Sequence, residues 1–490
     1  MISTQIFQTL AASAVGLRTP YPIRDAGVVA DALPPHLLPE GFDRNVASFP
    51  LTYLDSTAST KMIRPVRETL EAALAHYANS HSVTHGPARI STHAFEKAHE
   101  TVMGFVNAPK THAAVFVGNG TTGAVNRLAR ILFSDGRRGG RDTVIFSGME
   151  HHANILPWLK HAPYALGVPV DPSTGTLSLE RVEESLKSRR HRTRLLAVTN
   201  ISNVTGIVND VAALTRLAHE YGAEIFVDAA QTAAHKAIDM AANQIDYLAF
   251  SGHKVYAPGS PGVLILPESA SPRVPDEMGG GIVLSVNLDN YLLSDRLPDR
   301  EEAGTPNILG AVLLARALKT LQGIGMEAVW AHEAELTRQL LAGLGVFEEI
   351  TVYGDTNFDR TPRAGVVSFD VKGLHHAIVG QALADYFNIA VRNECFCAHP
   401  YVKALKGVTR EELEAFEAAV QQGDHSGTPG MVRASLGIYT TEDDIERFHA
   451  AIDWVVANAE RLRSEYEVNR DGVAIRRDGW RIDPESFGIL

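Results

Sequence analysis

The chain has 490 residues and a formal net charge of −12 at pH 7. An acidic chain argues against a nucleic-acid partner, because binding to a phosphate backbone depends on clustered cations. The apolar fraction of 45% and the charged fraction of 21% are those of an ordinary soluble globular protein. No apolar run approaches the roughly 20 residues that span a bilayer, so a membrane partner is not expected either.

The chain contains only two cysteines, Cys395 and Cys397, separated by one residue. Two neighbouring thiols cannot stabilise a chain of this length by disulfide cross-links. A secreted fold that depends on disulfides is therefore excluded, and a cytoplasmic location is expected. The first 16 residues are mildly apolar but lack a basic segment, so we do not interpret them as a signal peptide. The position of the only two thiols next to each other therefore raises the question of a chemical role.

Residues 1–50 are rich in proline and predict an arm that runs over the surface of the protein. From residue 51, short apolar runs alternate with amphipathic stretches, a pattern typical of βαβ units in a mainly parallel sheet. Ligands of such sheets bind at the carboxyl ends of the strands. The expected strands are Ala113–Val117, Thr143–Ser147, Leu195–Thr199, Glu224–Asp228, Tyr247–Ser251 and Gly262–Leu266, and the expected helices are Thr122–Phe133, Leu179–Leu186 and Val211–Tyr221.

Beyond about residue 310, the pattern indicates a smaller α+β domain. The elements expected there are a helical stretch Leu309–Leu344, short strands Gly365–Phe369 and Ile389–Arg392, and a helix near Thr441–Arg461. Gly407–Pro429 is predicted to be a surface insertion with a helix at Arg410–Gln422. The expected division is an arm (1–50), a large domain (51–310), a small domain joined by the arm (311–463) and a charged tail (464–490).

Two charged residues follow buried strands. Lys254 comes after Tyr247–Ser251, where a lysine is costly unless it is paired or used covalently. A Schiff base with an aldehyde cofactor is one such use, because partial burial lowers the pKa of the amine. Asp228 ends an earlier strand, and a carboxylate there can keep the pyridine nitrogen of pyridoxal phosphate protonated. Taken singly, a snorkelling lysine and a helix-capping aspartate explain the two residues more simply.

A third strand, Ala113–Val117, leads into a helix whose first turn holds Gly120, Thr121 and Thr122. The exposed N–H groups and the dipole of a helix start favour a phosphate, although glycine and threonine are also ordinary capping residues. Three such junctions, each fitting a different part of one cofactor, predict a site for pyridoxal 5'-phosphate.

Short motifs follow one another in the order Gly120–Thr122, Met149–Ile155, Ser202–Asn203, Val227–Gln231, Phe250–Lys254, Gly279–Gly281 and Glu302–Asn307. This order resembles that of the class V aminotransferase family, and within it the cysteine desulfurases and selenocysteine lyases, from about Tyr53 to about Arg461. The resemblance implies the α/β architecture of fold-type I pyridoxal-phosphate enzymes. These have a large domain with a seven-stranded, mainly parallel sheet, a smaller α+β domain, and active sites at a homodimer interface.

The resemblance also implies roles for individual residues. Lys254 would bind the cofactor covalently, and Asp228 would contact its pyridine nitrogen. His151 would stack on the ring and assist proton transfer, and Gln231 would contact the phenolic oxygen. The phosphate would be held by Thr121, Thr122, Ser251, His253 and, from the other subunit, Thr305, and the substrate carboxylate by Asn203 and Arg433.

Cys397 takes the place at which desulfurases carry their nucleophilic cysteine. The resemblance implies that its thiolate attacks the sulfur of a bound amino acid and leaves alanine and a persulfide. The residues before it, Glu394–Phe396, differ from the Gly-His-His of desulfurases and, with the insertion Gly407–Pro429, are similar to molybdenum cofactor sulfurases, whose loop reads Cys-Phe-Cys. The thiols can also be inert loop residues, whereas a structural zinc site would need a second cysteine pair.

The leading hypothesis is a pyridoxal-phosphate cysteine desulfurase-like enzyme that acts on L-cysteine or a related sulfur or selenium amino acid. A homodimer, a small amino-acid substrate and a sulfur-acceptor protein are the expected partners, and no metal is expected. The alternative is a class V aminotransferase, C–S lyase or epimerase of a specialised amino acid. A catalytically silent sulfur-relay or scaffold protein is the hypothesis of another class, against which the set Lys254, Asp228 and His151 argues.

Overall fold

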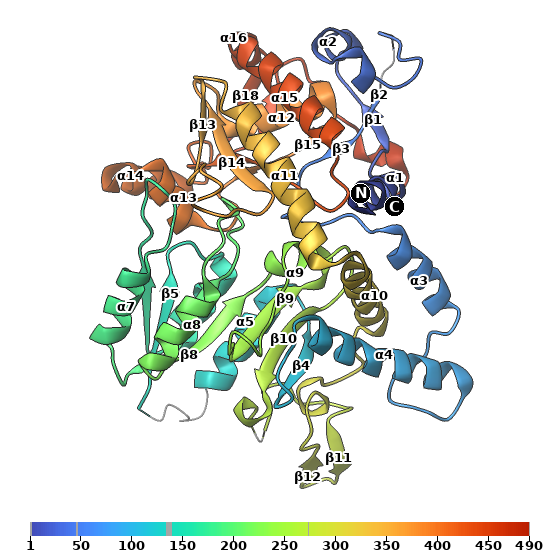
Figure 1. Cartoon of the computed structure of the whole chain (residues 1–490), viewed down its shortest axis with the longest axis vertical. Helices are drawn as coiled ribbons and strands as arrows, with labels where there is room; N and C mark the ends of the chain where they lie inside the picture. The colour runs from blue at the N-terminus through green and yellow to red at the C-terminus, as the bar shows by residue number, and fades with distance from the viewer. Residues whose placement is uncertain (1, 46–47, 134–139, 273, 490) are drawn as a thin grey trace.

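A seven-stranded sheet lies at the centre of the chain before residue 310 (Figure 1). The computed structural model describes residues 2–45, 48–133, 140–272 and 274–489, and its strand order in this sheet is β4–β10–β9–β8–β7–β5–β6. β10 runs antiparallel to its neighbours and the other pairs are parallel, which confirms the predicted mainly parallel sheet. The strands are β4 (His112–Val117), β5 (Thr143–Ser147), β6 (Tyr164–Val168), β7 (Thr193–Thr199), β8 (Glu224–Asp228), β9 (Tyr247–Ser251) and β10 (Gly262–Pro267).

Both faces of this sheet are buried, as the continuous apolar runs require. Along β4, Ala114 and Phe116 belong to one apolar core, and Val115 and Val117 belong to the other. The edge strand β6 is different, because three of its five residues are exposed, and its sequence therefore does not predict a strand. The helices of this part are α3 (Arg64–Leu74), α4 (Gly86–Phe105), α5 (Gly120–Phe133), α6 (Leu156–His161), α7 (Leu179–Ser188), α8 (Val211–Glu220) and α9 (Thr232–His235).

The part after residue 310 contains a four-stranded antiparallel sheet in the order β13–β14–β17–β16. Its strands are β13 (Ile350–Val352), β14 (Val366–Val371), β16 (Arg392–Glu394) and β17 (Met431–Ser435). Helices that belong to this part are α11 (Met326–Leu344), α12 (His376–Phe387), α13 (His399–Lys406), α14 (Arg410–Gln421), α15 (Glu442–Ala457) and α16 (Ala459–Glu465). The insertion helix predicted at Arg410–Gln422 is therefore present as α14.

Two predicted elements of this part are divided in the structure. The helical stretch Leu309–Leu344 consists of α10 (Ile308–Ile324) and α11, which meet at an angle of 79° because Gly325, with φ of +91°, separates them. The strand expected at Ile389–Arg392 is shared between β15 (Ile389–Ala390) and β16. β15 pairs with β3 (Thr52–Tyr53) and not with the four-stranded sheet, so this segment changes its pairing partner just before the cysteines.

The N-terminal arm is more regular than its prolines predict. It contains α1 (Ile2–Ser13), β1 (Pro20–Pro22), α2 (Ala26–Ala32) and β2 (Ser48–Pro50). Phe7 and Leu10 of α1 are buried in the larger core, and the Phe7 ring stacks on His332 of α11 at 3.9 Å. Within the described residues, no single helix is long and apolar enough to cross a membrane, and only the bent pair of α10 and α11 together meets that criterion.

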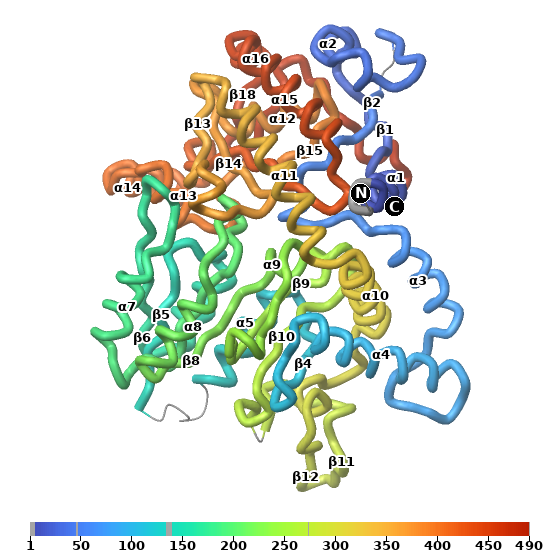
Figure 2. Tube along the Cα trace, viewed as in Figure 1, coloured from blue at the N-terminus to red at the C-terminus, as the bar shows by residue number. Residues whose placement is uncertain are grey.

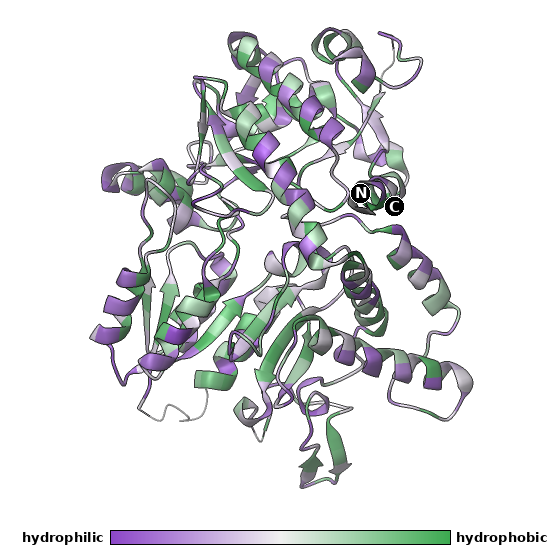
Figure 3. Cartoon of the chain, viewed as in Figure 1, coloured by the Kyte–Doolittle hydropathy of each residue, from purple (hydrophilic) through white to green (hydrophobic). Residues whose placement is uncertain are grey.

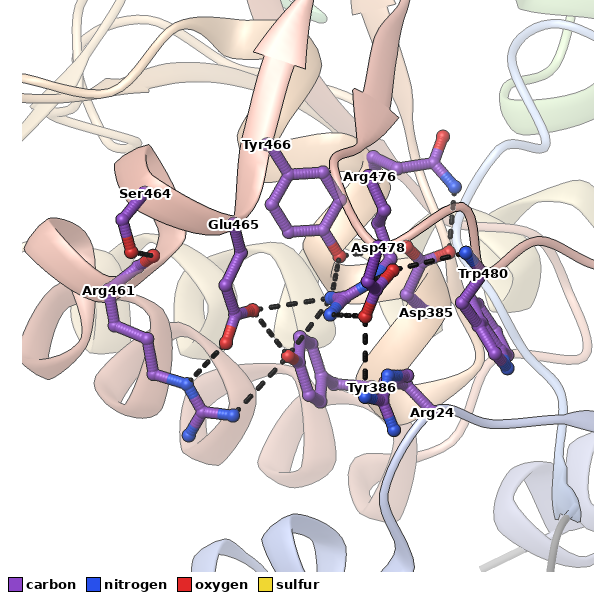
Figure 4. Close-up of polar contacts among 11 residues, drawn as sticks. Arg24, Asp385, Tyr386, Arg461, Ser464, Glu465, Tyr466, Arg476, Asp478 and Trp480 are labelled. Atoms are coloured by element: carbon purple, nitrogen blue, oxygen red, sulfur yellow. Dashed lines mark hydrogen bonds and ion pairs between the residues drawn. The ribbon is translucent and has the colours of Figure 1, made fainter.

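The C-terminal tail forms the hairpin β18 (Tyr466–Val468) and β19 (Ala474–Arg476) and lies beside the arm (Figure 2), where the Tyr21 and Phe487 rings are 5.4 Å apart. Arg476 is the centre of a polar network that fastens this hairpin (Figure 4). Its guanidinium donates hydrogen bonds to Tyr386, Glu465, Tyr466 and Asp478. Arg24 of the arm contacts Asp478 at 3.3 Å, so the network joins both ends of the chain to α12.

Replacing Arg476 by alanine is expected to destabilise the fold. Its side chain is 4% exposed, and its removal leaves two buried tyrosine hydroxyls and the carboxylate of Glu465 without their shared donor. We expect the free energy of unfolding to fall by about 2–3 kcal/mol. The loss is not larger, because the partner carboxylates stay partly hydrated. The measurement is the urea midpoint of Arg476→Ala beside that of Arg477→Ala. Arg477 pairs with Glu467 while 56% exposed, and its variant should stay within about 0.5 kcal/mol of the wild type.

Candidate active site

Polar side chains converge at the carboxyl ends of β8 and β9, where the sequence predicted a ligand site. They line a cavity of about 310 Å³, here called the site cavity, which falls within the usual size of small-molecule sites. All but one of the predicted site residues line it. These are Thr121, Thr122, His151, Asn203, Asp228, Gln231, Ser251, His253, Lys254, Cys397 and Arg433.

Lys254 and Asp228 lie at neighbouring strand ends in this cavity. Lys254 ends the short helix η3 (Gly252–Lys254) that follows β9, and burial lowers the pKa of its amine to about 8, while Asp228 acts in the opposite direction. Burial raises the pKa of Asp228, whose carboxylate accepts a hydrogen bond from the Ala230 N–H at 2.9 Å. A lysine with a pKa near 8 has about a tenth of its amine unprotonated at pH 7, far more than an ordinary lysine, and it is therefore the better nucleophile.

The start of the 14-residue helix α5 forms a tight cradle beside Ser251. Gly120 has φ of +59°, and a Cβ atom on it would lie 2.5 Å from Ser251 Oγ. A Cβ atom on Gly262 would lie 2.3 Å from the Gly120 carbonyl oxygen. The Thr121 N–H donates to Ser251 Oγ at 2.7 Å, and the two hydroxyl oxygens are 2.8 Å apart. This concentration of donors at a helix N-terminus is suited to an anion such as a phosphate.

His151 presents a neutral ring to the site cavity. Its Nδ1 accepts a hydrogen bond from the Ala153 N–H at 3.0 Å, and burial, followed by the nearby Lys254, lowers its pKa to about 3. Gln231 donates from Nε2 to the Thr57 carbonyl oxygen at 3.1 Å. Burial likewise lowers the pKa of His253 to about 4. At neutral pH both imidazoles are therefore uncharged.

Arg433 brings a buried guanidinium from β17 to the same cavity. It donates to the Asn203 carbonyl oxygen at 2.9 Å, pairs with Asp55 at 3.3 Å, and lies 4.5 Å from the Phe396 ring centroid. Burial lowers the pKa of Arg433 to about 10. Its Nε is buried and has no hydrogen-bond partner among the described residues. Because an unpaired buried donor is costly, this guanidinium is suited to receive a carboxylate oxygen.

Glu394–Cys397, here called the Cys loop, has an unusual backbone. Glu394, Phe396 and Cys397 have φ values of +98°, +53° and +54°, a region that residues other than glycine rarely occupy. Two hydrogen bonds hold the loop, from Asn203 Nδ2 to the Phe396 carbonyl at 2.8 Å and from the His152 N–H to the Cys397 carbonyl at 2.6 Å. Asn203, predicted to bind substrate, thus contacts the Cys loop through its amide.

The two thiols differ in their surroundings. Cys397 is exposed and lines the site cavity. Cys395 is buried, its Sγ donates to the Pro429 carbonyl oxygen at 2.7 Å, and burial raises its pKa to about 11. Since the thiolate is the nucleophile, Cys395 is the poorer candidate for attack on a substrate.

Comparison with known proteins identifies the family. A family model described as aminotransferase class-V matches residues 52–448. The chain belongs to the class V aminotransferase family. It is 34% identical to the cysteine desulfurase of Salmonella typhimurium over 416 residues, which cover 84% of this chain and 94% of that protein. The cysteine desulfurase of Shigella flexneri is also 34% identical, over 82% of this chain and 93% of that protein.

Solved structures of the class V aminotransferase family support the fold-type I architecture. The apo cysteine desulfurase of Thermococcus onnurineus NA1 has a TM-score of 0.72 and 31% identity, and the match covers 83% of this chain and 94% of that one. A cysteine desulfurase of Escherichia coli has a TM-score of 0.69 and 28% identity over 83% of this chain and 94% of that one.

Thr305 is the predicted residue that does not line the site cavity. It is exposed, its Oγ1 accepts a hydrogen bond from Asn79 Nδ2 at 3.1 Å, and it lines an adjacent cavity of about 890 Å³. Thr122 and His253 line both cavities. In this member of the class V aminotransferase family, the threonine therefore lies next to the predicted phosphate cradle but outside it.

Several site residues were not predicted from the sequence. Asp55 and Arg392 form an ion-pair set with Arg433, in which Arg392 contacts Asp55 at 3.8 Å. Glu150 does not line the site cavity but contacts Thr199, which does: it accepts a hydrogen bond from the Thr199 N–H at 2.8 Å and has a pKa that burial raises to about 8. Within the described ranges, no group of three or more His, Cys, Asp or Glu side chains is placed to hold a metal ion.

Proposed function

We propose that this protein is a pyridoxal-phosphate-dependent cysteine desulfurase that converts L-cysteine to alanine and leaves a persulfide on Cys397. The observation that carries the proposal is that Lys254, Asp228 and the exposed Cys397 line one cavity of about 310 Å³. The relatives named above, which match more than four fifths of the chain, support the same activity. A reducing compartment would keep the Cys397 thiol free for this role.

The residues of the site cavity fit pyridoxal phosphate. Lys254 would bind it covalently, and Asp228 would face its ring nitrogen. The glycine cradle at Gly120, into which no Cβ fits, would let its phosphate approach the start of α5, beside Thr121 and Ser251. The remaining contacts are assigned to Thr122, His151, Gln231 and His253. When bound, the cofactor supplies an electron sink for bond breaking in the substrate.

The residues of the chain then have separate tasks in the reaction. Arg433 binds the substrate carboxylate through its guanidinium, and Asn203 holds the Cys loop beside it. The Lys254 amine, whose pKa burial lowers to about 8, moves the proton at the substrate α-carbon. The His151 ring is neutral at rest because burial lowers its pKa to about 3, and it carries a positive charge only while it holds an accepted proton.

Cys397 performs the sulfur transfer. Its thiolate forms a bond to the sulfur of L-cysteine, and the bond between that sulfur and the substrate β-carbon breaks. The electron pair of this bond remains on the carbon side, where protonation completes alanine. One cysteine and one Cys397 thiol thus give one alanine and one Cys397 persulfide, without an external oxidant or reductant.

A second copy of the chain is inferred to complete the site. Thr305 lines the 890 Å³ cavity beside Thr122 and His253, a position from which it could contact a phosphate held by the other subunit. The hairpin β11 (Val283–Val286) and β12 (Tyr291–Leu293) projects from this part of the molecule, and its ribbon includes hydrophobic segments, green in Figure 3. Leu284, Leu288 and Leu292 are more than half exposed, which favours burial against a partner.

Product analysis tests the proposed function. Purified protein loaded with pyridoxal phosphate is mixed with L-cysteine without added thiol, and alanine, pyruvate and sulfide are quantified. We expect about one alanine per active site in the first turnover, with an equal amount of protein-bound sulfur. Pyruvate with free sulfide would instead identify a C–S lyase. Sulfur retained in a keto acid would identify a transaminase, and sulfur retained in D-cysteine would identify an epimerase.

A further inference from the structure

Another cavity, distinct from the two described above, lies on the side of the Cys loop opposite the site cavity. It has a volume of about 600 Å³ and is here called the outer cavity. Glu394, Phe396 and Cys397 line both the outer cavity and the site cavity. The Cys loop therefore lies between two cavities, and Cys397 lines both. The outer volume is within the range of small-molecule sites.

The outer cavity is lined by segments that have no role in the proposed function. α13 contributes Lys403, and the insertion helix α14 contributes Phe416 and Val420. The tail hairpin adds Asp471 and Gly472. The Lys403 ammonium lies 5.5 Å from the Phe416 ring centroid and links the two helices across the cavity. None of the residues of α14 is buried, so the helix contributes surface to the protein and adds nothing to its core.

Two imidazoles stand next to Cys397 on the outer side. His152 accepts a hydrogen bond at Nε2 from the His399 N–H at 3.1 Å, and the two ring centroids are 4.5 Å apart. His152 also donates its own N–H to the Cys397 carbonyl oxygen at 2.6 Å. Burial lowers the pKa of both rings, that of His399 to about 4. At neutral pH both rings are therefore uncharged and add no positive charge beside Cys397.

The charges of the outer cavity favour a cation. Glu394, Glu417 and Asp471 are exposed carboxylates, and Lys403 is the opposing ammonium. In the described part of the chain, none of these four groups forms an ion pair, so the carboxylates are available to a ligand. None of the large exposed apolar side chains lines the cavity, and it lacks the anchor that a protein partner usually needs.

We propose that the outer cavity binds a small thiol that carries an ammonium group and that this thiol removes sulfur from Cys397, which lines both cavities. The proposal rests on the proposed function, because it needs the persulfide. The acceptor reacts as its thiolate, after its proton has passed to solvent, and its sulfur attacks the terminal sulfur of the persulfide. The bond between the two persulfide sulfurs breaks, Cys397 leaves as a thiolate, and the acceptor departs as a persulfide.

Steady-state alanine formation with cysteamine as the acceptor tests this site. We expect the rate to saturate with cysteamine in the wild type. Val420→Trp places an indole in the outer cavity and is expected to raise the half-saturating cysteamine concentration by about tenfold or more. Ala418→Trp is the matched control, because Ala418 is exposed on the same helix and does not line the cavity. The first-turnover yield of alanine, measured with about one equivalent of L-cysteine per active site and no other thiol, reports the site cavity, which neither residue lines.

A second pair of variants tests the charge. The ratio of the rates with cysteamine and with 3-mercaptopropionate is compared between variant and wild type, so the intrinsic reactivity of each thiol cancels. Glu417→Lys should lower this ratio about three- to tenfold, because it reverses a charge at the cavity. Glu411→Lys makes the same change at an exposed position of α14 outside the cavity and should leave the ratio near that of the wild type.

The outcomes separate this inference from the proposed function. If the wild type forms no alanine in the first turnover, the proposed function is wrong. The acceptor site is then wrong as well, because there is no persulfide from which a thiol could remove sulfur. If the first turnover is normal but the rate rises linearly with cysteamine and equally in Val420→Trp, the acceptor site is overturned and the desulfurase remains. An unchanged thiol ratio in Glu417→Lys overturns the preference for a cation.

Discussion

Lys254→Ala is expected to lose both the visible absorbance of bound pyridoxal phosphate and the formation of alanine. The covalent link and the proton transfer at the substrate α-carbon both depend on this amine, which is buried at the end of β9 with a pKa lowered to about 8. Loss of a proton-transfer group alone lowers rates by about 10²–10⁴-fold, and loss of the covalent link adds to this. An absorption spectrum and the first-turnover alanine yield measure the two effects.

Lys236→Ala is the matched control for this experiment. Lys236 lies 5.8 Å from the Trp330 ring centroid and outside the site cavity, so both its spectrum and its alanine yield should resemble those of the wild type. A Lys254→Ala protein that keeps the wild-type spectrum would show that another group holds the cofactor. In that case, the whole assignment of the site cavity would have to be abandoned.

Cys397→Ala is expected to keep the visible spectrum and to lose alanine formation from L-cysteine by about 10²-fold or more. The spectrum should survive because Lys254, Asp228 and the helix start at Thr121 are untouched. The alanine should disappear because no other thiol of the chain is exposed in the site cavity. Alanine quantification and mass spectrometry of the protein, in which a persulfide adds one sulfur atom, measure the result.

Cys395→Ala gives the comparison that separates the two thiols. Cys395 is buried with its Sγ bonded to the Pro429 carbonyl, so its removal should leave the first turnover of alanine and the added sulfur atom in place. If instead the sulfur is found on Cys395, or if Cys397→Ala still forms alanine at the wild-type rate, the persulfide has been assigned to the wrong residue.

The parts of the site that could be predicted are those that local sequence determines. Lys254, Asp228 and the Gly120 turn each follow a continuous apolar run, and such runs have a recognisable strand pattern. The strand bounds Thr143–Ser147, Glu224–Asp228 and Tyr247–Ser251 agree with those of β5, β8 and β9. Because strand ends of a parallel sheet meet at one edge, these residues could be placed together without further information.

The features that could not be predicted depend on contacts between distant segments. Asp55 follows the two-residue strand β3, which pairs with β15 more than 300 positions later, and so short a strand has no pattern of its own. The outer cavity needs α14 and the tail hairpin to meet in space. The division of Leu309–Leu344 depends on Gly325 alone, because the apolar periodicity continues on both sides of it.

The fastening of the tail has a consequence for how the protein is made. Arg24 and Asp478 are 454 positions apart, and Arg18 and Asp444 are 426 positions apart, so these contacts of the arm need segments that are synthesised much later. Domains usually fold in the order of synthesis, whereas contacts of such separation form late. The seven-stranded sheet can thus assemble on the nascent chain before the arm makes these two contacts. A ribosome-stalled chain that lacks Asp444 and Asp478 would therefore be cut by proteases around Arg18 and Arg24 faster than the folded protein.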